Sequence, residues 1–450
     1  MKSLSQSGAN SLEHHWMPFS ANKHFKSEPR LVSEAKGLYF KNNRGEPVID
    51  GVSGLFCTPA GHGRAEIADA VHKQLLNLDY VPPFQFGHEL SFELARRVAE
   101  LLPGDLDYVF FANSGSEAID TAMKIALQYH RSKGQAQRTR FVSRERGYHG
   151  VNFGGLSLAG MVRNRETFGN TLPGVSHIRH TWQEETRFAR GEPETGAELA
   201  DDLQRHVDLY GADTIAACFV EPIAGSTGIL VPPKGYLKRL REICDRHGIL
   251  LVFDEVICGF GRTGKAFGAD AFGVVPDLLT MAKGITNGNI PMGAVGASEK
   301  VYKTIVDNGP AKGIEFFHGY TYSAHPVACA AGLATLDIFK KEKLFEKADA
   351  LAPYFLDKVY ALRDIPIVSD IRGYGLLAGI DLLAADKPGL RGYEVLQDLF
   401  NGGMLARVTV DTVILAPAFI CEHKHIDEII DKVRRVLSRH AQRAGIKLAS

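Results

Sequence analysis

Three ionisable residues each follow directly after an apolar run of the chain. They are Glu221 after residues 215–220, Asp254 after residues 249–253 and Lys283 after residues 278–282. A lysine amine withdrawn from water at a strand end loses its proton, and the neutral amine can then attack a carbonyl. Each residue alone is explained as well by a solvated or salt-bridged strand end. Together they indicate one site in which an amine and two carboxylates act on a ligand.

A turn of small residues, NSGSE at positions 113–117, follows the apolar run 108–111 and leads into a helical pattern. Small residues at the start of a helix leave backbone N–H groups and hydroxyls free for an anion, most naturally a phosphate. A plain turn with a serine N-cap would give the same residues. The turn therefore supports a phosphate site only in combination with the three strand ends.

Five continuous apolar runs predict the strands that position these groups. They cover residues 108–111, 140–142, 215–220, 249–253 and 278–282. Runs without polar alternation are typical of parallel strands that helices cover on both faces. Residues 236–247 supply one such helix, whose pattern ends at Gly248. Because ligands bind beyond the carboxyl ends of parallel strands, the fold should bring the candidate groups to one edge of the sheet.

Pyridoxal phosphate requires all the groups in this set. It needs a phosphate cradle, a lysine that holds its aldehyde as a Schiff base, and a carboxylate that faces its pyridine nitrogen. Asp254 would keep that nitrogen protonated, so that the ring accepts electrons from the broken Cα–H bond of a substrate. Lys283 would form the imine and, once a substrate displaces it, would move the proton as a base.

Composition and charge exclude several other classes of protein. The chain has 450 residues, of which 45% are hydrophobic and 23% charged, as in ordinary globular proteins. Lys plus Arg and Asp plus Glu both number 52, so no net field favours nucleic acid or an anionic membrane surface. The six cysteines contain no C-x-x-C pair and are expected in the core, with no metal site. Without an apolar signal segment or membrane span, we expect a cytoplasmic protein.

The predicted secondary structure changes near residue 326, from alternating strands and helices to long amphipathic helices with a few strands. We therefore predict a large domain over residues 61–325 and a C-terminal segment, 326–450, of a smaller domain. Residues 1–60, with a hairpin around 43–45, should complete the smaller domain, because terminal segments often lie close together. The predicted fold is α/β, a large domain with a mostly parallel sheet plus a smaller α+β domain built from both termini.

Seven stretches of the chain resemble class III aminotransferases, pyridoxal phosphate enzymes of the aspartate-aminotransferase-like fold (fold type I). They are NSGSEA (113–118), GYHG (147–150), EPIAGSTG (221–228), ILLVFDEVICGFGRTG (249–264), PDLLTMAKG (276–284), PMGAV (291–295) and HGYTYSAHP (318–326). A closer likeness is to the omega-amino acid:pyruvate (β-alanine:pyruvate) aminotransferases. It rests on HWMPFSANKHF (15–25), LDYVPPFQFGH (78–88), PPKGYLKRLREIC (232–244) and HGYTYSAHPVACAAGLA (318–334).

The resemblance implies a role for each matching position. Ser114, Gly115 and Ser116 would bind the cofactor phosphate, Tyr148 would stack on the pyridine ring, Val256 would press its opposite face, and Glu221 would support Asp254. Thr321 would reach the phosphate from a partner subunit. This implies a homodimer or homotetramer with the active site at the subunit interface. His149, His318, His325 and Arg262 are expected to be structural.

The substrate pocket implied by the resemblance contains Phe19, Phe56, Phe86, Tyr148 and Arg407. The planar guanidinium of Arg407 would pair with the carboxylate of the substrate or the keto acid, although an arginine before a β-branched run is often only a strand-edge charge. Relatives usually have Trp at the position of Phe56 and a polar residue at that of Ile414. Both changes would widen the pocket and make it less polar, which favours a bulkier or less polar donor than β-alanine.

The function that these features favour is a ping-pong transamination from an omega-amino acid or related primary amine to a keto acid, with pyruvate as the expected acceptor. A racemase, aminomutase or decarboxylase on the same scaffold stays open, because fold and cofactor do not fix which bond breaks. A non-catalytic pyridoxal phosphate-binding regulator is a further alternative, although no DNA-binding module accompanies the lysine and aspartate.

Overall fold

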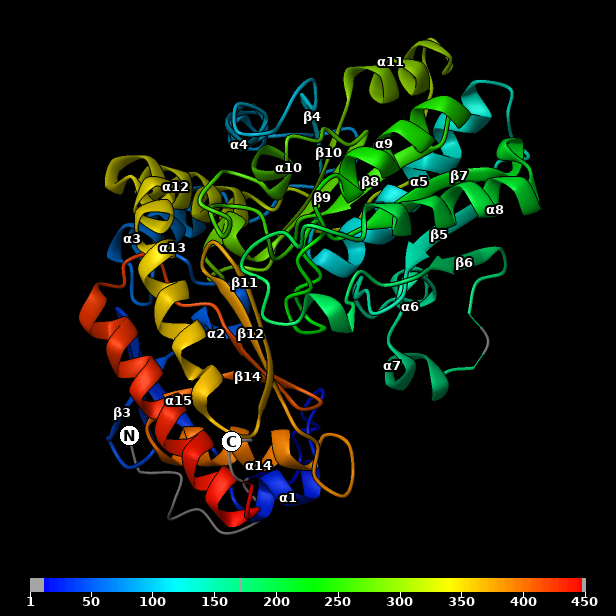
Figure 1. The fold of residues 1–450 in the computed structure, drawn as a ribbon. Coiled ribbons are helices and arrows are strands. Elements are labelled where there is room, and N and C mark those ends of the chain that lie inside the picture. The colour runs from blue at the N-terminus through cyan, green and yellow to red at the C-terminus, as the bar shows by residue number, and fades with distance from the viewer. Residues whose placement is uncertain (1–11, 170, 447–450) are drawn as a thin grey trace.

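A seven-stranded sheet forms the centre of the larger part of the chain (Figure 1). The computed structural model describes residues 12–169 and 171–446. The strands lie in the order β4-β10-β9-β8-β7-β5-β6. Their bounds are β4 Tyr108–Ala112, β5 Arg140–Arg144, β6 Val175–Ile178, β7 Ile215–Val220, β8 Leu250–Asp254, β9 Leu278–Met281 and β10 Gly293–Ala297. All neighbours pair in parallel except at β10, which is antiparallel to both β4 and β9.

Helices cover both faces of this sheet, as the unbroken apolar runs predicted. Leu250 and Val252 of β8 share a hydrophobic cluster with residues of α5, whereas Leu251 and Phe253 share another with residues of α9. Alternate residues of a strand point to opposite faces, so α5 and α9 lie on opposite sides. The helices are α3 Ala65–Asn77, α4 Glu89–Ala99, α5 Gly115–Ser132, α6 Phe153–Leu158, α7 Val162–Glu166, α8 Asp202–Tyr210, α9 Tyr236–His247, α10 Gly268–Phe272 and α11 Glu299–Asp307.

Two smaller sheets lie beside the large one. The first has the order β11-β12-β15-β14 and is antiparallel, and the second has the order β1-β2-β3-β13. The strands are β1 Val32–Lys36, β2 Tyr39–Asn42, β3 Pro47–Asp50, β11 Val368–Tyr374, β12 Leu377–Leu382, β13 Met404–Leu405, β14 Arg407–Thr409 and β15 Thr412–Leu415. The helices are α1 Asn22–Ser27, α2 Ser53–Phe56, α12 Pro326–Glu342, α13 Leu344–Tyr360, α14 Leu390–Asn401 and α15 His423–Arg443.

Segments from the two ends of the chain meet in this region. Strand β3 pairs in parallel with β13, and the Tyr39 hydroxyl of β2 donates a hydrogen bond to Glu428 of α15 over 2.7 Å. Figure 1 shows the blue N-terminal strands and the red helix α15 together. The domain boundaries at residues 60 and 325 stay a prediction. Residues 1–11 and 447–450 of the predicted smaller domain lie outside the described residues.

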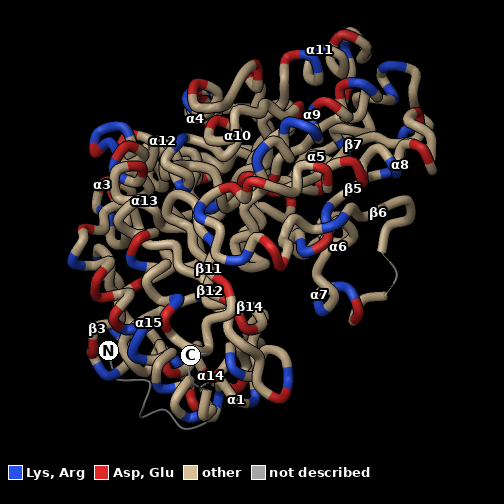
Figure 2. The backbone as a smooth tube through the Cα atoms, in the orientation of Figure 1, with Lys and Arg blue, Asp and Glu red and all other residues tan. Residues whose placement is uncertain are grey.

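Lysine and arginine are interspersed with acidic residues over the described backbone (Figure 2). Among the described residues, no helix has the length and apolar character needed to cross a membrane. A cytoplasmic location stays a prediction. All six cysteines are free, and five of them are buried, whereas Cys57 is only half-buried.

Candidate active site

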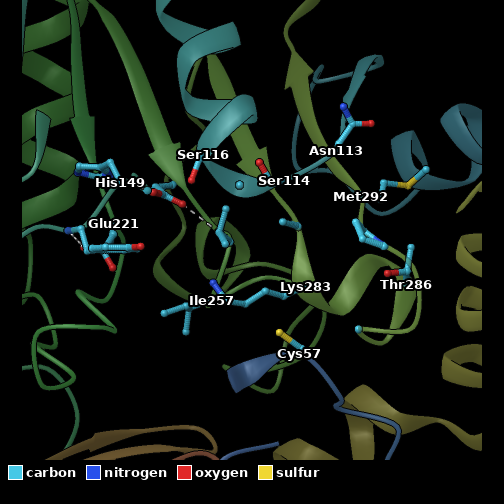
Figure 3. A pocket seen from close by; sticks show the side chains of 18 of the residues that line it. Cys57, Asn113, Ser114, Ser116, His149, Glu221, Ile257, Lys283, Thr286 and Met292 are labelled. Atoms are coloured by element: carbon cyan, nitrogen blue, oxygen red, sulfur yellow. Dashed lines mark hydrogen bonds and ion pairs between the residues drawn. The ribbon is translucent and has the colours of Figure 1, made fainter. Parts of the chain in front are cut away.

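A cavity of about 320 Å³ lies at the carboxyl ends of the central strands. Its wall contains most of the cofactor-binding residues expected from the sequence: Ser114, Gly115, Ser116, Tyr148, Glu221, Asp254, Val256 and Lys283. Figure 3 shows the side chains of Ser116, Glu221 and Lys283 converging on this space from different segments. The sheet thus brings together residues that are up to about 170 positions apart in the sequence.

Lys283 enters the cavity from a strained turn. Strand β9 ends at Met281, and Lys283 opens a short 3₁₀ helix with a left-handed φ of 50°. The side chain of Asn287 fixes this turn, because it accepts a hydrogen bond from Ala60 N and donates one to Gly61 O, both over 2.9 Å. Burial lowers the pKa of Lys283, and the opposing charges of Asp254 and Glu221 reduce that effect only in part. The site thereby favours a neutral, reactive amine.

Asp254, the last residue of β8, is held from three sides. Its Oδ1 accepts hydrogen bonds from Val256 N over 3.2 Å and from the Thr280 hydroxyl over 3.3 Å. Its Oδ2 lies 2.8 Å from Nδ1 of His149 and accepts a hydrogen bond from it when the imidazole carries its proton on Nδ1. Asp254 and His149 are only 6% and 1% exposed. A carboxylate fixed in this way suits the task of facing a protonated ring nitrogen.

Glu221 does not hold Asp254 directly, which corrects the expectation from the family resemblance. Its Oε1 accepts the N–H of Tyr148 over 3.0 Å, and its Oε2 accepts the N–H of Gly225 over 2.9 Å. Burial raises the pKa of Glu221, and the nearby charge of Asp254 raises it further. Glu221 therefore positions the backbone of Tyr148, whereas the hydrogen bond to Asp254 comes from His149.

The start of α5 forms the expected cradle for a phosphate. Ser114 is its N-cap and accepts the N–H of Glu117 over 3.2 Å, while the first N–H groups of a helix have no acceptor within it. A Cβ on Gly115 would lie 3.0 Å from a methyl of Val256, and one on Gly150 would lie 2.4 Å from Ser116 Oγ. These glycines keep the cradle open, so the residues present fit pyridoxal phosphate.

Five of the predicted site residues do not line the cavity of this chain: Phe19, Phe56, Phe86, Thr321 and Arg407. Phe19 and Phe86 are 76% and 70% exposed, and Thr321 is also exposed. Arg407 is not on the wall of the cavity either, but it lies close enough to Tyr148 for their charges to interact. Burial lowers the pKa of the Arg407 guanidinium, which has no carboxylate partner among the described residues and so is available for one.

Phe56 and Ile414 lie in a buried cluster rather than on the cavity wall, where we expected them. They are 3% and 0% exposed and pack with Val52, Ile223 and other apolar residues. Phe56 adopts a left-handed φ of 63° at the end of α2, and its neighbour Cys57 lines the cavity instead. The proposed widening of the pocket by these two residues therefore has no support in the structure.

The remaining predicted structural residues have structural contacts. His318 Nε2 pairs with the Thr121 hydroxyl over 2.8 Å, and His325 accepts the N–H of Val327 at the start of α12. The Arg262 side chain is buried and donates to the carbonyl of Pro417 over 2.6 Å. Asn287, Thr280 and Cys57 were not predicted as site residues. Thr280 lies within the stretch 276–284, and Cys57 and Asn287 lie near predicted site residues, which are the only sequence signals that could have indicated them.

Comparison with known proteins identifies the family. Residues 20–437 match the family described as aminotransferase class-III. The chain is 52% identical to an omega-aminotransferase of Caulobacter vibrioides, with 96% of this chain and 99% of the relative covered. It is 48% identical to an omega-amino acid–pyruvate aminotransferase of Pseudomonas putida, with 95% and 96% covered.

Solved structures agree with this assignment. An (S)-enantioselective omega-transaminase from Thermomicrobium roseum superposes with a TM-score of 0.92 at 35% identity, covering 98% of this chain and 99% of that one. The omega-transaminase of Pseudomonas jessenii in complex with PMP gives the same TM-score at 31% identity, covering 97% and 98%. The chain therefore belongs to the class III aminotransferases, enzymes that transfer amino groups with pyridoxal phosphate as cofactor.

Proposed function

We propose that this aminotransferase takes the amino group of an omega-amino acid or a related primary amine and transfers it to pyruvate in two half-reactions. The proposal is supported by the names of the relatives at 48–52% identity, which include omega-amino acid–pyruvate and β-alanine–pyruvate aminotransferases. The observation that carries it is Lys283 beside Asp254 and the α5 cradle in one cavity.

Each side chain of the cavity has a distinct task in this proposal. Bound pyridoxal phosphate supplies an aldehyde for the donor amine and a ring that accepts the electron pair of the broken Cα–H bond. Lys283 Nζ would hold the aldehyde at rest and would then carry the proton away from and back to carbon. Ser114, Gly115 and Ser116 would bind the phosphate.

The other side chains hold the ring. Asp254 would face the ring nitrogen and keep it protonated, as its fixed position at the end of β8 allows. Tyr148 and Val256, which both line the cavity, would cover the two faces of the ring. Arg407 would pair with the carboxylate of an omega-amino acid or of pyruvate. The carboxylate would then exchange its hydrating water for a bidentate contact with the guanidinium.

The half-reaction without an acceptor tests this function. With an omega-amino acid alone, the absorbance of the bound cofactor should convert to the pyridoxamine form and stop, and pyruvate should restore it. A racemase given a chiral amino acid alone would instead keep turning over, and a decarboxylase would release carbon dioxide. The rate of Lys283→Ala should fall by about 10²- to 10⁴-fold. Lys73→Ala, which changes an exposed lysine of α3, should keep the wild-type rate. Full activity of Lys283→Ala would refute the assignment.

The proposed active unit is a homodimer, or a tetramer built from it. Large aromatic side chains stay exposed on the single chain, which indicates a surface that a second copy covers. They include Phe19, Phe84, Phe86, Phe92, Phe317 and Tyr322. In this proposal Thr321 of one chain reaches the phosphate bound by the other, and Phe19 and Phe86 complete the substrate pocket.

Mixing two inactive variants tests the shared site. Thr321→Glu places a charge against the phosphate, and Lys283→Ala removes the reactive amine. When the two proteins are unfolded together and refolded, hybrid dimers should contain one intact site and recover activity, whereas each variant refolded alone should not. If the mixture stays inactive although ultracentrifugation shows that it contains dimers, Thr321 does not belong to the partner's site.

A further inference from the structure

A second cavity, of about 590 Å³, lies between α7 and the antiparallel sheet β11-β12-β15-β14. No residue lines both this cavity and the one that contains Lys283. Its wall includes Arg146, Arg163, Arg187, Trp182, Thr227 and Thr409. The volume is within the range of small-molecule sites in proteins. The proposed transamination gives this cavity no role.

The acidic groups on the wall are already engaged. Asp370 accepts the N–H of Phe188 over 2.6 Å and the indole N–H of Trp182 over 2.9 Å, and it also pairs with Arg372. Asp381 accepts from Arg372 over 2.6 and 2.8 Å and from the Thr412 hydroxyl over 2.6 Å. These carboxylates have little capacity left for a ligand.

The third acid of the wall, Asp411, is engaged as well. Its two oxygens accept the N–H groups of Gly389 and Gly392, over 2.7 and 2.9 Å, at the start of α14. A helix start is where a carboxylate is most stable. All three acids are thus neutralised or hydrogen-bonded by the protein itself.

The arginines of the wall are not paired in this way. Arg146 has one long contact, 3.4 Å to the carbonyl of Thr227, and Arg163 donates to the carbonyl of Pro388 over 3.2 Å. Neither forms an ion pair among the described residues, and Arg187 has only a loose surface pair with Glu184 at 3.7 Å. Burial and the positive charge of Arg372 lower the pKa of Arg146, and the charges of Asp381 and Asp370 offset this only in part. An anion beside Arg146 would relieve the remaining effect.

Neutral groups complete the pattern. The hydroxyls of Thr227 and Thr409 are buried and have no hydrogen-bond partner among the described residues. The bond to Asp370 fixes the indole of Trp182, and the guanidinium carbon of Arg146 lies 6.0 Å from its ring centre. Met161 and Val410 add apolar surface. The cavity therefore offers guanidinium groups and hydroxyls beside a flat apolar wall.

We propose that this cavity binds a small organic carboxylate with an aromatic or otherwise apolar body. Arg146 and Arg163 would receive the carboxylate, with hydrogen bonds from the two threonine hydroxyls, because a guanidinium matches the geometry of a carboxylate. The indole of Trp182 would pack against the body of the ligand. This site is independent of the proposed transamination.

Trp182 offers a direct measurement of binding. The chain has two tryptophans, and the other, Trp16, is 89% exposed. In a Trp16→Phe holoenzyme the fluorescence of Trp182 should change and saturate on titration with phenylacetate. Phenylacetamide, which has the same ring without the charge, should bind at least about 10-fold more weakly. Inorganic phosphate should also bind more weakly, since it cannot use the apolar wall.

Arginine variants identify the binding site. Arg146→Met and, separately, the exposed Arg163→Met should each weaken phenylacetate binding about 10-fold or more. Arg205→Met, which changes an exposed arginine of α8, should leave it unchanged. Arg407→Ala should also leave it unchanged, which excludes binding in the active site.

Three results would overturn the proposal. They are equal affinity for acid and amide, tighter binding of inorganic phosphate, or wild-type affinity in both arginine variants. None of these depends on turnover, so a failure of the proposed transaminase function would be seen separately.

Discussion

Nδ1 of His149 lies 2.8 Å from Oδ2 of Asp254, and both side chains are almost completely buried. His149 belongs to the loop after β5, whereas Asp254 ends β8. The contact therefore joins the carboxyl ends of two strands of the sheet. The other ring nitrogen of His149 is buried and has no hydrogen-bond partner among the described residues. The imidazole therefore serves mainly to orient Asp254.

His149→Gln should weaken the hydrogen bond to Asp254, while the glutamine side chain still fills the space of the imidazole. A hydrogen bond to a charged group contributes about 1.5–3 kcal/mol, so kcat should fall by about 10- to 100-fold. The affinity for pyridoxal phosphate should fall as well, because Asp254 would lose its orientation. Titration of the apoenzyme with cofactor and steady-state kinetics measure the two effects.

His72→Gln, which changes an exposed histidine of α3, is the matched control. A purely structural role of His149 would lower the melting temperature and leave kcat and cofactor affinity at wild-type values, and that result would contradict the assignment.

The strands were predictable because their sequences show how they are buried. Strands β7 and β8 contain only buried residues, so each produces an unbroken apolar run. Strand β10, with the sequence GAVGA, was not predicted. Its small side chains give no such run, yet a Cβ on Gly293 would lie 2.2 Å from the carbonyl of Ser114. Because the 113–117 turn lies so close, position 293 requires a small residue. Small residues do not produce the apolar run by which a strand is recognised in a sequence.

The reactive residues were more predictable than their supports. Lys283 and Asp254 stand at the ends of predicted strands, so the rule for parallel sheets places them together. The contact of His149 with Asp254 spans 105 positions, and no local spacing can reveal it. The expectation that Glu221 supports Asp254 failed for the same reason. Its carboxyl instead binds backbone N–H groups, which every residue type except proline carries.

Arg407→Ala should separate donors that carry a carboxylate from simple amines. In the donor half-reaction, measured without pyruvate, the apparent dissociation constant for β-alanine should rise about 10- to 100-fold, because a charged hydrogen-bond partner is lost. The value for an uncharged aryl-alkyl amine should change much less. Arg407→Lys should recover part of the affinity for β-alanine. Equal effects on both donors would remove Arg407 from the carboxylate site.

The lowered pKa of Lys283 predicts how cofactor uptake depends on pH. The neutral amine attacks the aldehyde, so the rate at which apoenzyme takes up pyridoxal phosphate should rise with pH. The rise should level off below the ordinary lysine pKa of about 10.4, because burial lowers the pKa of Lys283. Stopped-flow absorbance measures the rate of uptake. The pH dependence with which surface lysines of the same protein are labelled gives the reference for an ordinary lysine.

The same shift affects the stability of the apoenzyme. Between the lowered folded pKa and the higher unfolded pKa, only the unfolded chain keeps the proton, so the free energy of unfolding should increase as pH rises. Lys283→Met should lack this increase. Identical pH dependence of unfolding in the two apoproteins would show that the amine of Lys283 titrates normally.

Gly150→Ala should damage the phosphate cradle specifically. Gly150 has a left-handed φ of 88°, and an added Cβ would lie 2.4 Å from Ser116 Oγ and 2.7 Å from Ser116 Cα. Gly134→Ala is the matched control, because Gly134 has a similar φ of 73° but nothing within 4 Å of an added Cβ. Each substitution costs about 1 kcal/mol of backbone strain. Only Gly150→Ala should also lower the affinity for pyridoxal phosphate, by about 10-fold or more, as measured by cofactor titration. If both variants bound the cofactor equally well, Ser116 would not belong to the phosphate site.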